Sequence, residues 1–143
     1  MSQESNRRLI QRGHEARSAG RIVDWMETLD PEIEWDISAY PVEGFPERGS
    51  GRAEFVGHVT RYWSIWNDYA QEVKEIIEAG DEVVVVLGEH ARLRNSDADL
   101  DREVAAVWTI EHGVRTRFRA FPSRETALRA TGIEAPASSR SAP

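Results

Sequence analysis

The sequence predicts a single α+β domain, in which helices from the first half of the chain pack on one face of an antiparallel sheet. In the first half, apolar residues recur at helical spacing in three segments. In the second half, extended segments with alternating apolar residues follow one another through short turns. Helices followed by an antiparallel meander are typical of a two-layer fold. The length of 143 residues is that of one domain with its own core.

Four helices are expected, at residues 4–19, 21–29, 51–66 and 123–131. The clearest is the third, in which Phe55, Val59, Tyr62 and Trp66 recur at steps of four, three and four residues. This spacing gives an apolar stripe along one helix face. Asp30-Pro31 is expected to end the second helix, because proline lacks the amide hydrogen that a helix interior needs.

Five strands are expected, at residues 32–38, 69–79, 82–94, 102–111 and 114–121. Gly80-Asp81 and His112-Gly113 are tight-turn signals between successive strands. Residues 39–51 are rich in proline and glycine and form a loop, but they also carry Tyr40 and Phe45. Because of these apolar residues, we expect the loop to pack over another part of the domain.

Composition limits the classes of function. The formal charge of −7 disfavours nucleic-acid binding, and the absence of cysteine excludes thiolate catalysis and disulfides. No apolar run is long enough for a membrane span, and the start of the chain is polar, so we expect a cytoplasmic protein without a membrane partner. No spacing of His, Asp or Glu indicates a metal site, and no motif indicates a cofactor. The domain is expected to span 1–133, and the Ala/Ser/Pro-rich tail at 134–143 is expected to be disordered.

The order of these segments resembles the nuclear transport factor 2-like superfamily, and within it the SnoaL-like branch. The likeness rests on short pieces in a given order: Asp30-Pro31 with Ile33 to Asp36, Gly51 to Phe55, Trp66 to Tyr69, Ala79 to Asp81 before four valines, Val107 to Thr109, and Gly132. The resemblance implies a curved sheet wrapped against three helices around a conical cavity. Members include isomerases, polyketide cyclases, epoxide hydrolases, dehydratases and non-catalytic binding subunits, so the fold alone does not give the function.

Three known chemistries of that superfamily lack their key groups here. For the steroid isomerase pattern, the carboxylate base falls near Asp36, but the two oxyanion donors correspond to Gly13 and about Ala105. The epoxide hydrolase pattern implies an aspartate near Ala120. The polyketide cyclase pattern implies an acidic residue near the end of the last strand, where this chain has Ser123.

Asp36 and His90 are the candidate catalytic residues. Asp36 would be a base whose pKa is raised by apolar neighbours such as Trp35, and its partner would be His90 or, alternatively, His58. Strand alternation also allows the opposite interpretation, in which both side chains face solvent or a dimer partner.

The candidate ligand-binding residues are mostly aromatic, since flat apolar rings suit the wall of a pocket. They are Trp25, Tyr40, His58, Tyr62, Trp63, Trp66, Trp108 and Arg119. His14 on the first helix is a further polar candidate. On the last strand, Arg115, Arg117 and Arg119 are expected to form one solvated or dimer-facing stripe, with Phe118 on the buried face.

These patterns predict an apolar pocket for a small hydrophobic molecule. The favoured hypothesis is a cofactor-independent isomerase, cyclase or dehydratase that moves a proton. A non-catalytic dimeric binding or accessory protein, or a purely structural module, remains the alternative. The sheet face away from the helices is expected to pair in a homodimer, because of its Trp and Val content.

Overall fold

The computed structural model of the chain describes residues 5–93 and 99–134. Within them lie four helices and one six-stranded sheet. The helices are α1 (Asn6–Ser18), α2 (Ile22–Met26), α3 (Arg52–Ser64) and α4 (Arg124–Thr131). The strands are β1 (Leu29–Asp36), β2 (Arg48–Ser50), β3 (Trp66–Ala79), β4 (Glu82–Leu93), β5 (Asp99–Glu111) and β6 (Val114–Phe121). The predicted α+β fold class is confirmed.

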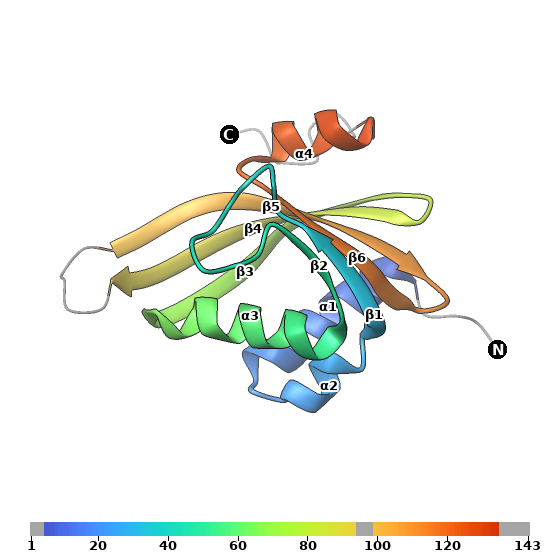
Figure 1. Cartoon of the computed structure of the whole chain (residues 1–143). Coiled ribbons are helices and arrows are strands. Elements are labelled where there is room, and N and C mark those ends of the chain that lie inside the picture. Colours follow the sequence, from blue (N-terminus) through green and yellow to red (C-terminus); the bar gives the residue numbers. More distant parts are fainter. Residues whose placement is uncertain (1–4, 94–98, 135–143) are drawn as a thin grey trace.

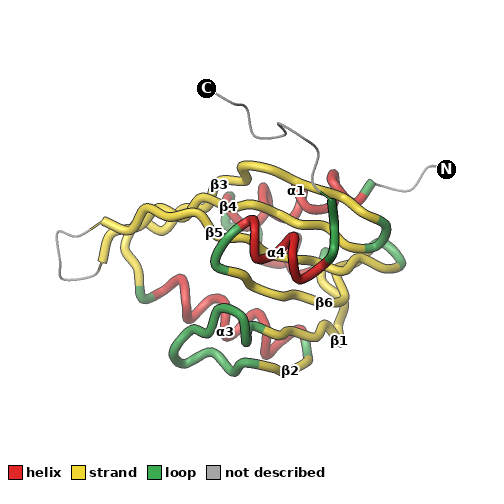
Figure 2. Tube along the Cα trace, turned by 90° about the horizontal axis from the view of Figure 1, so that it is seen from above, coloured by secondary structure: helices red, strands yellow, loops and turns green. Residues whose placement is uncertain are grey.

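The sheet is curved and is covered differently on its two faces. It arches over α1, α2 and α3, while α4 lies on the opposite face (Figure 1). Its strand order is β2-β1-β6-β5-β4-β3, with β1 and β6 parallel and the other neighbours antiparallel. Seen from the α4 side, that helix crosses the middle strands of the sheet (Figure 2). We call the face toward α1–α3 the inner face and the face toward α4 the outer face.

The valine run of β4 shows how both faces are buried. Val83 and Val85 belong to the inner core with Leu9, Trp35 and Phe55. Val84 and Val86 belong to the outer core beneath α4, and both are fully buried. A strand covered on both sides reads as a continuous apolar run, which is why four successive valines stand here. The outward valines are therefore already covered within the single chain.

Several element boundaries differ from the sequence-based prediction. The second helix ends at Met26, and β1 begins at Leu29, so Asp30-Pro31 lies within a strand. The pairing of β1 with β6 is irregular between Leu29 and Glu34, so Pro31 sits where regular ladder bonds are interrupted. The short strand β2 falls inside the predicted loop. A polar turn is also expected at 95–101, but residues 99–101 belong to β5 and the rest of that stretch lies outside the described residues. The expected disordered tail beyond Glu134 also lies outside them.

No helix in the described part of the chain is long and apolar enough to cross a membrane.

Candidate functional site

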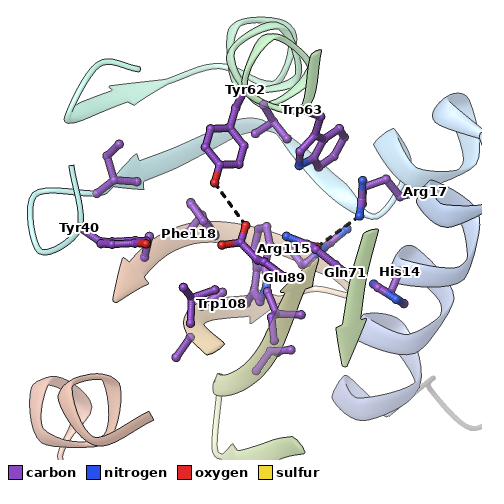
Figure 3. Close-up of a pocket in the computed structure, with 18 of the residues that line it drawn as sticks. His14, Arg17, Tyr40, Tyr62, Trp63, Gln71, Glu89, Trp108, Arg115 and Phe118 are labelled. Atoms are coloured by element: carbon purple, nitrogen blue, oxygen red, sulfur yellow. Dashed lines mark hydrogen bonds between the residues drawn. The ribbon is translucent and has the colours of Figure 1, made fainter. Parts of the chain in front are cut away.

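A cavity of about 160 Å³ lies between the inner face of the sheet and the helices. Tyr40, Val42 and Phe45 from the loop between β1 and β2 close part of it. Its wall is mainly apolar, and its aromatic residues include Trp25, Tyr62, Trp63, Trp108 and Phe118. The polar side chains that line it are those of His14, Arg17, Gln71, Glu89 and Arg115 (Figure 3). An apolar hollow with a few convergent polar groups is the usual form of a small-molecule site.

Five of the predicted ligand-binding residues line this cavity. They are Trp25, Tyr40, Tyr62, Trp63 and Trp108. The rings of Trp25 and Trp63 pack together with their centroids 5.5 Å apart, so α2 and α3 meet through aromatic contact.

The other three predicted ligand-binding residues are not among the lining residues. His58 packs against Trp35 and Phe45 and contacts Arg61 through Nδ1 at 2.8 Å. Trp66 lies at the start of β3 against Tyr62. Arg119 pairs with Glu82 at 2.9 Å. Each is engaged in local packing or pairing outside the cavity wall.

Asp36 and His90, the predicted catalytic pair, also lie outside the cavity. Asp36 accepts hydrogen bonds from the Ser38 hydroxyl at 2.6 Å and the Ser38 amide at 2.9 Å. These bonds, with the charge of Arg48, hold the pKa of Asp36 below its usual value, which is opposite to the expected direction. His90 is exposed, and its Nδ1 lies 3.1 Å from Oδ1 of Asp101. Strand alternation accounts for both positions, because their neighbours Trp35 and Glu89 take the buried face.

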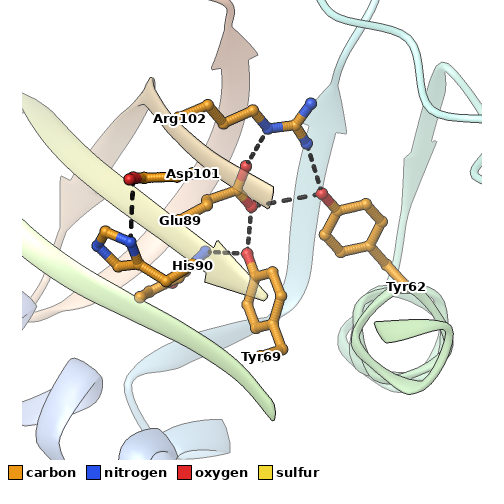
Figure 4. A network of polar contacts seen from close by, with 7 residues as sticks. Tyr62, Tyr69, Glu89, His90, Asp101 and Arg102 are labelled. Atoms are coloured by element: carbon orange, nitrogen blue, oxygen red, sulfur yellow. Dashed lines mark hydrogen bonds and ion pairs between the residues drawn. The ribbon is translucent and has the colours of Figure 1, made fainter. Parts of the chain in front are cut away.

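The carboxylate of Glu89 is the centre of a buried polar network, which we call the Glu89 network (Figure 4). The Glu89 residue is 4% exposed, and its Oε1 accepts from Nε of Arg102 at 2.8 Å. Its Oε2 accepts from the hydroxyls of Tyr69 and Tyr62, the latter at 3.3 Å. Arg102 also donates to the Tyr62 hydroxyl at 2.8 Å. A buried carboxylate with three donors is well satisfied.

The pKa shifts around Glu89 follow from this pairing. Burial, reinforced by the charge of Glu89, raises the pKa of Tyr62 to about 12 and raises that of Tyr69 as well. Burial alone would lower the pKa of Arg102, but the bond to Glu89 outweighs it and raises the pKa. The tyrosines therefore stay protonated and Arg102 stays charged near neutral pH.

Arg115 stands in a different environment on the same cavity. The residue is 4% exposed, and its Nη2 donates to the hydroxyl of Thr28, which is neutral. Its Cζ lies 4.3 Å from the ring centroid of Trp108, and its Nε has no hydrogen-bond partner. Burial lowers the pKa of Arg115 to about 9, and the nearby charge of Arg12 adds to the effect. The guanidinium still carries its charge at neutral pH.

A bulge in β6 turns Arg115 inward. On β5, Thr109 pairs with Arg117 and the next residue, Ile110, pairs with Arg115, so Thr116 is an extra residue. Because one residue is inserted, Arg115 and Phe118 both line the cavity although they are three positions apart. The prediction that Arg115 belongs to an outward stripe with Arg117 and Arg119 is therefore wrong.

Gly13 on α1 gives the Arg115 guanidinium its space. A Cβ atom at this position would lie 2.7 Å from Nη2 of Arg115 and 3.2 Å from the Thr28 hydroxyl oxygen. Both distances are shorter than ordinary contact, so a larger residue would displace one of these groups. Gly13 stands at the position that the steroid isomerase pattern assigns to a tyrosine, and the space beside it is occupied by the side chain of Arg115 from β6.

His14 follows Gly13 on α1 and lines the cavity. Burial lowers the pKa of His14, and the charges of Arg17 and Arg115 lower it further. The imidazole is therefore neutral at physiological pH and has a free electron pair. A neutral imidazole beside a cavity is suited to accept a proton.

Sequence reasoning missed Glu89 and Arg115 for different reasons. Glu89 is in phase with Val83, Val85 and Leu87, and a carboxylate on the buried side of a strand is a signal that alternation alone could have revealed. The inward turn of Arg115 depends on the bulge at Thr116, which has no glycine or proline to mark it.

The described residues contain no group of three or more His, Asp or Glu side chains that could hold a metal ion.

The chain thus combines an α+β fold, a curved sheet with three helices on its inner face, and a cavity between the two layers. The family model of the SnoaL-like domain matches residues 10–129. The chain therefore belongs to the SnoaL-like family, as the resemblance in its sequence implied. No curated protein matches it.

Solved structures extend the likeness at the level of the fold. An NTF2-like protein of unknown function from Burkholderia pseudomallei K96243 has a TM-score of 0.72 at 18% identity, covering 87% of this chain and 95% of that one. TerC, co-crystallised with polyporic acid, has a TM-score of 0.68 at 17% identity, covering 87% and 96%. A proposed polyketide cyclase from Sinorhizobium meliloti has a TM-score of 0.63 at 19% identity, covering 78% and 92%.

Proposed function

We propose that this protein binds a small hydrophobic metabolite in the cavity and moves a proton on it without a cofactor, as an isomerase, cyclase or dehydratase does. The observation that carries the proposal is the meeting of His14 and Arg115 at one aromatic cavity. Membership of the SnoaL-like family supports the same class of chemistry. Asp36 and His90 remain predictions from the sequence, and the proposed chemistry does not need them.

The proposed roles follow from the charges of the two groups. Nε2 or Nδ1 of neutral His14 would accept a proton from a carbon next to a carbonyl group. Arg115 would stabilise the negative oxygen that forms, and the imidazolium would then return the proton to another position. A positioned acid–base group contributes roughly 10²- to 10⁴-fold to a rate, and a donor aimed at an oxyanion contributes on a similar scale.

Hydrogen exchange at carbon tests this role directly. Small ketones and enones that raise the melting temperature of the protein are incubated with it in deuterium oxide, and uptake of deuterium at carbon is followed by mass spectrometry. His14→Asn is expected to lower the exchange rate by about 10²-fold or more. His90→Asn and Asp36→Asn are the matched variants for the sequence-based prediction. Exchange that survives His14→Asn would remove His14 as the base.

A non-catalytic dimeric binding protein is the second candidate. It is favoured because Glu89, whose carboxylate lines the cavity and could otherwise act as a base, already accepts hydrogen bonds from three donors. A bound metabolite that shows no exchange in the same assay would support this alternative. Native mass spectrometry of protein purified from its own host would identify a retained ligand.

A homodimer through the outer face is part of that alternative. In the single chain α4 already covers Val84 and Val86, and the outer side chains beyond it include the exposed His90 and Arg92. A dimer would therefore use a largely charged surface and weaken with salt. Sedimentation at low and high ionic strength measures the oligomeric state.

A further inference from the structure

We propose that the ligand of this cavity is an organic acid about one aromatic ring in size, whose anionic oxygen binds the guanidinium of Arg115. The proposal rests on the proposed binding function and specifies its ligand class. It is independent of whether the protein is catalytic.

The first observation is the missing counter-charge at Arg115. A buried cation is costly unless an anion pairs with it and its N–H groups are hydrogen-bonded. The side-chain contacts of Arg115 are a neutral hydroxyl and an indole ring, and its Nε has no partner. Among the described residues, none of the ion pairs includes Arg115, and the nearby charge of Arg12 is repulsive.

The second observation is that the other cations near the cavity have partners. Arg102 pairs with the Glu89 carboxylate at 2.8 Å. Arg17 donates to Oε1 of Gln71 at 3.3 Å, lies 3.8 Å from the centroid of the Trp63 ring, and feels the favourable charge of Glu89. The surrounding protein thus pairs Arg102 with a carboxylate and partly offsets the charge of Arg17, whose pKa burial still lowers. Arg115 has no favourable charge near it among the described residues.

The third observation is that local structure holds Arg115 in the cavity wall. The bulge at Thr116 turns it inward, Gly13 leaves space for its guanidinium, and the rings of Trp108 and Phe118 pack with centroids 4.7 Å apart beside it. The guanidinium is planar and lies over the Trp108 ring, and its coplanar N–H donors suit a carboxylate or an enolate.

The size of the cavity limits the ligand. Its volume is about 160 Å³, close to the roughly 150 Å³ of an engineered cavity that binds benzene. Aromatic walls favour a flat ring over a branched aliphatic chain. One ring with a small acidic substituent fits both the volume and the charge.

Calorimetric titration with matched acids and amides tests the inference. Benzoate, phenylacetate and 4-hydroxybenzoate are each compared with the corresponding amide, which has nearly the same shape but no charge. Wild-type protein is expected to bind at least one acid about tenfold or more tightly than its amide, as for a charge-assisted hydrogen bond. Arg115→Met is expected to abolish this preference while its circular dichroism stays native.

Control variants separate Arg115 from general effects of charge. Arg117→Met removes an exposed cation two positions along the same strand and is expected to leave the acid preference unchanged. Arg17→Met removes the other arginine that lines the cavity, which contacts the neutral Gln71 amide and the Trp63 ring. It is expected to change the acid preference less than Arg115→Met does. If Arg17→Met loses the acid preference and Arg115→Met retains it, the acid binds Arg17, and the proposal is overturned.

The outcomes also distinguish this inference from the proposed function. If no acid binds more tightly than its amide, including the case in which no acid binds, the inference is wrong. Amide binding that Ala120→Leu blocks would then keep the cavity as a binding site, because Ala120 lines it. If Ala120→Leu has no effect on any binding, the cavity itself fails as the site.

Discussion

The cavity has two charged regions that differ in how their charges are balanced. Around Glu89, each charge has a partner within the chain: the carboxylate accepts from Arg102, Tyr62 and Tyr69. Around Arg115, a cation buried to the same extent meets a neutral hydroxyl and an indole ring. The first arrangement is explained by folding, since it satisfies buried groups. The second costs folding energy, and a ligand that binds there would recover that cost.

The largest expected effect is at the paired region. Glu89→Gln removes the anion but keeps the shape, so Arg102 loses its counter-charge and two tyrosine hydroxyls lose a strong acceptor. The free energy of unfolding is expected to fall by about 2–4 kcal/mol, measured by urea denaturation. Glu72→Gln, on the exposed side of the neighbouring strand, is the matched control and should change stability by less than about 0.5 kcal/mol. Equal losses in the two variants would contradict a structural role for the Glu89 network.

At Arg115, the free energy of unfolding is expected to change in the opposite direction. Arg115→Met replaces a buried cation with an apolar side chain of similar length, at the cost of one hydrogen bond and a cation–π contact. Without ligand, the free energy of unfolding is expected to rise by about 1–3 kcal/mol. Arg117→Met provides the baseline for loss of a cation on the same strand. A loss of stability comparable with that of Glu89→Gln would mean that Arg115 stabilises the fold in the absence of a ligand.

A glycine pair sharpens the comparison further. Gly13→Ala places a Cβ atom 2.7 Å from Nη2 of Arg115, so the guanidinium must shift. Gly57→Ala changes a helical glycine with nothing within 4 Å of the added atom. Gly57→Ala is expected to stabilise the protein by about 0.5–1 kcal/mol. Overpacking should turn this gain into a loss of about 1 kcal/mol at Gly13, as thermal unfolding would measure. Equal gains would show that Arg115 has free room.

The smallest effect concerns the pH dependence of stability through His14. Because its pKa is lowered in the folded state, the unfolded chain binds the proton more readily. Stability due to His14 is therefore full above its ordinary pKa of about 6.5 and is lost as pH falls through the lower folded value. His14→Asn should flatten this part of the stability curve, as urea denaturation at a series of pH values would measure. Identical curves for wild type and His14→Asn would contradict burial of the imidazole.

Much of the fold could be predicted from the sequence because its signals are local. Spacing at three and four residues identified α3, and Gly80-Asp81 and His112-Gly113 marked the turns of the β3-β4 and β5-β6 hairpins. The parallel pairing of β1 with β6 joins residues far apart in the chain, and no local pattern encodes it. The strand β2 is three residues long, too short for alternation to identify.

The candidate site was less predictable because it depends on strand register. Aromatic residues such as Trp25 and Trp108 could be assigned to the wall from their size, although Trp66, assigned on the same ground, is not among the lining residues. The chosen polar residues, Asp36 and His90, alternate with buried neighbours, and the regular phase of their strands turns them outward. The opposite holds for Arg115. The extra residue Thr116 interrupts the inward–outward alternation of β6 and brings the charged side chain of Arg115 into the core.

The claim that Arg115 binds the anionic group of a ligand is tested most directly by a crystal structure of the protein with benzoate, from crystals free of other organic acids. The expected result is a carboxylate oxygen within hydrogen-bond distance of Nε or an Nη of Arg115, with the ring against Trp108 and Phe118. A benzoate whose carboxylate points to Arg17 or to the solvent, with Arg115 untouched, would contradict it.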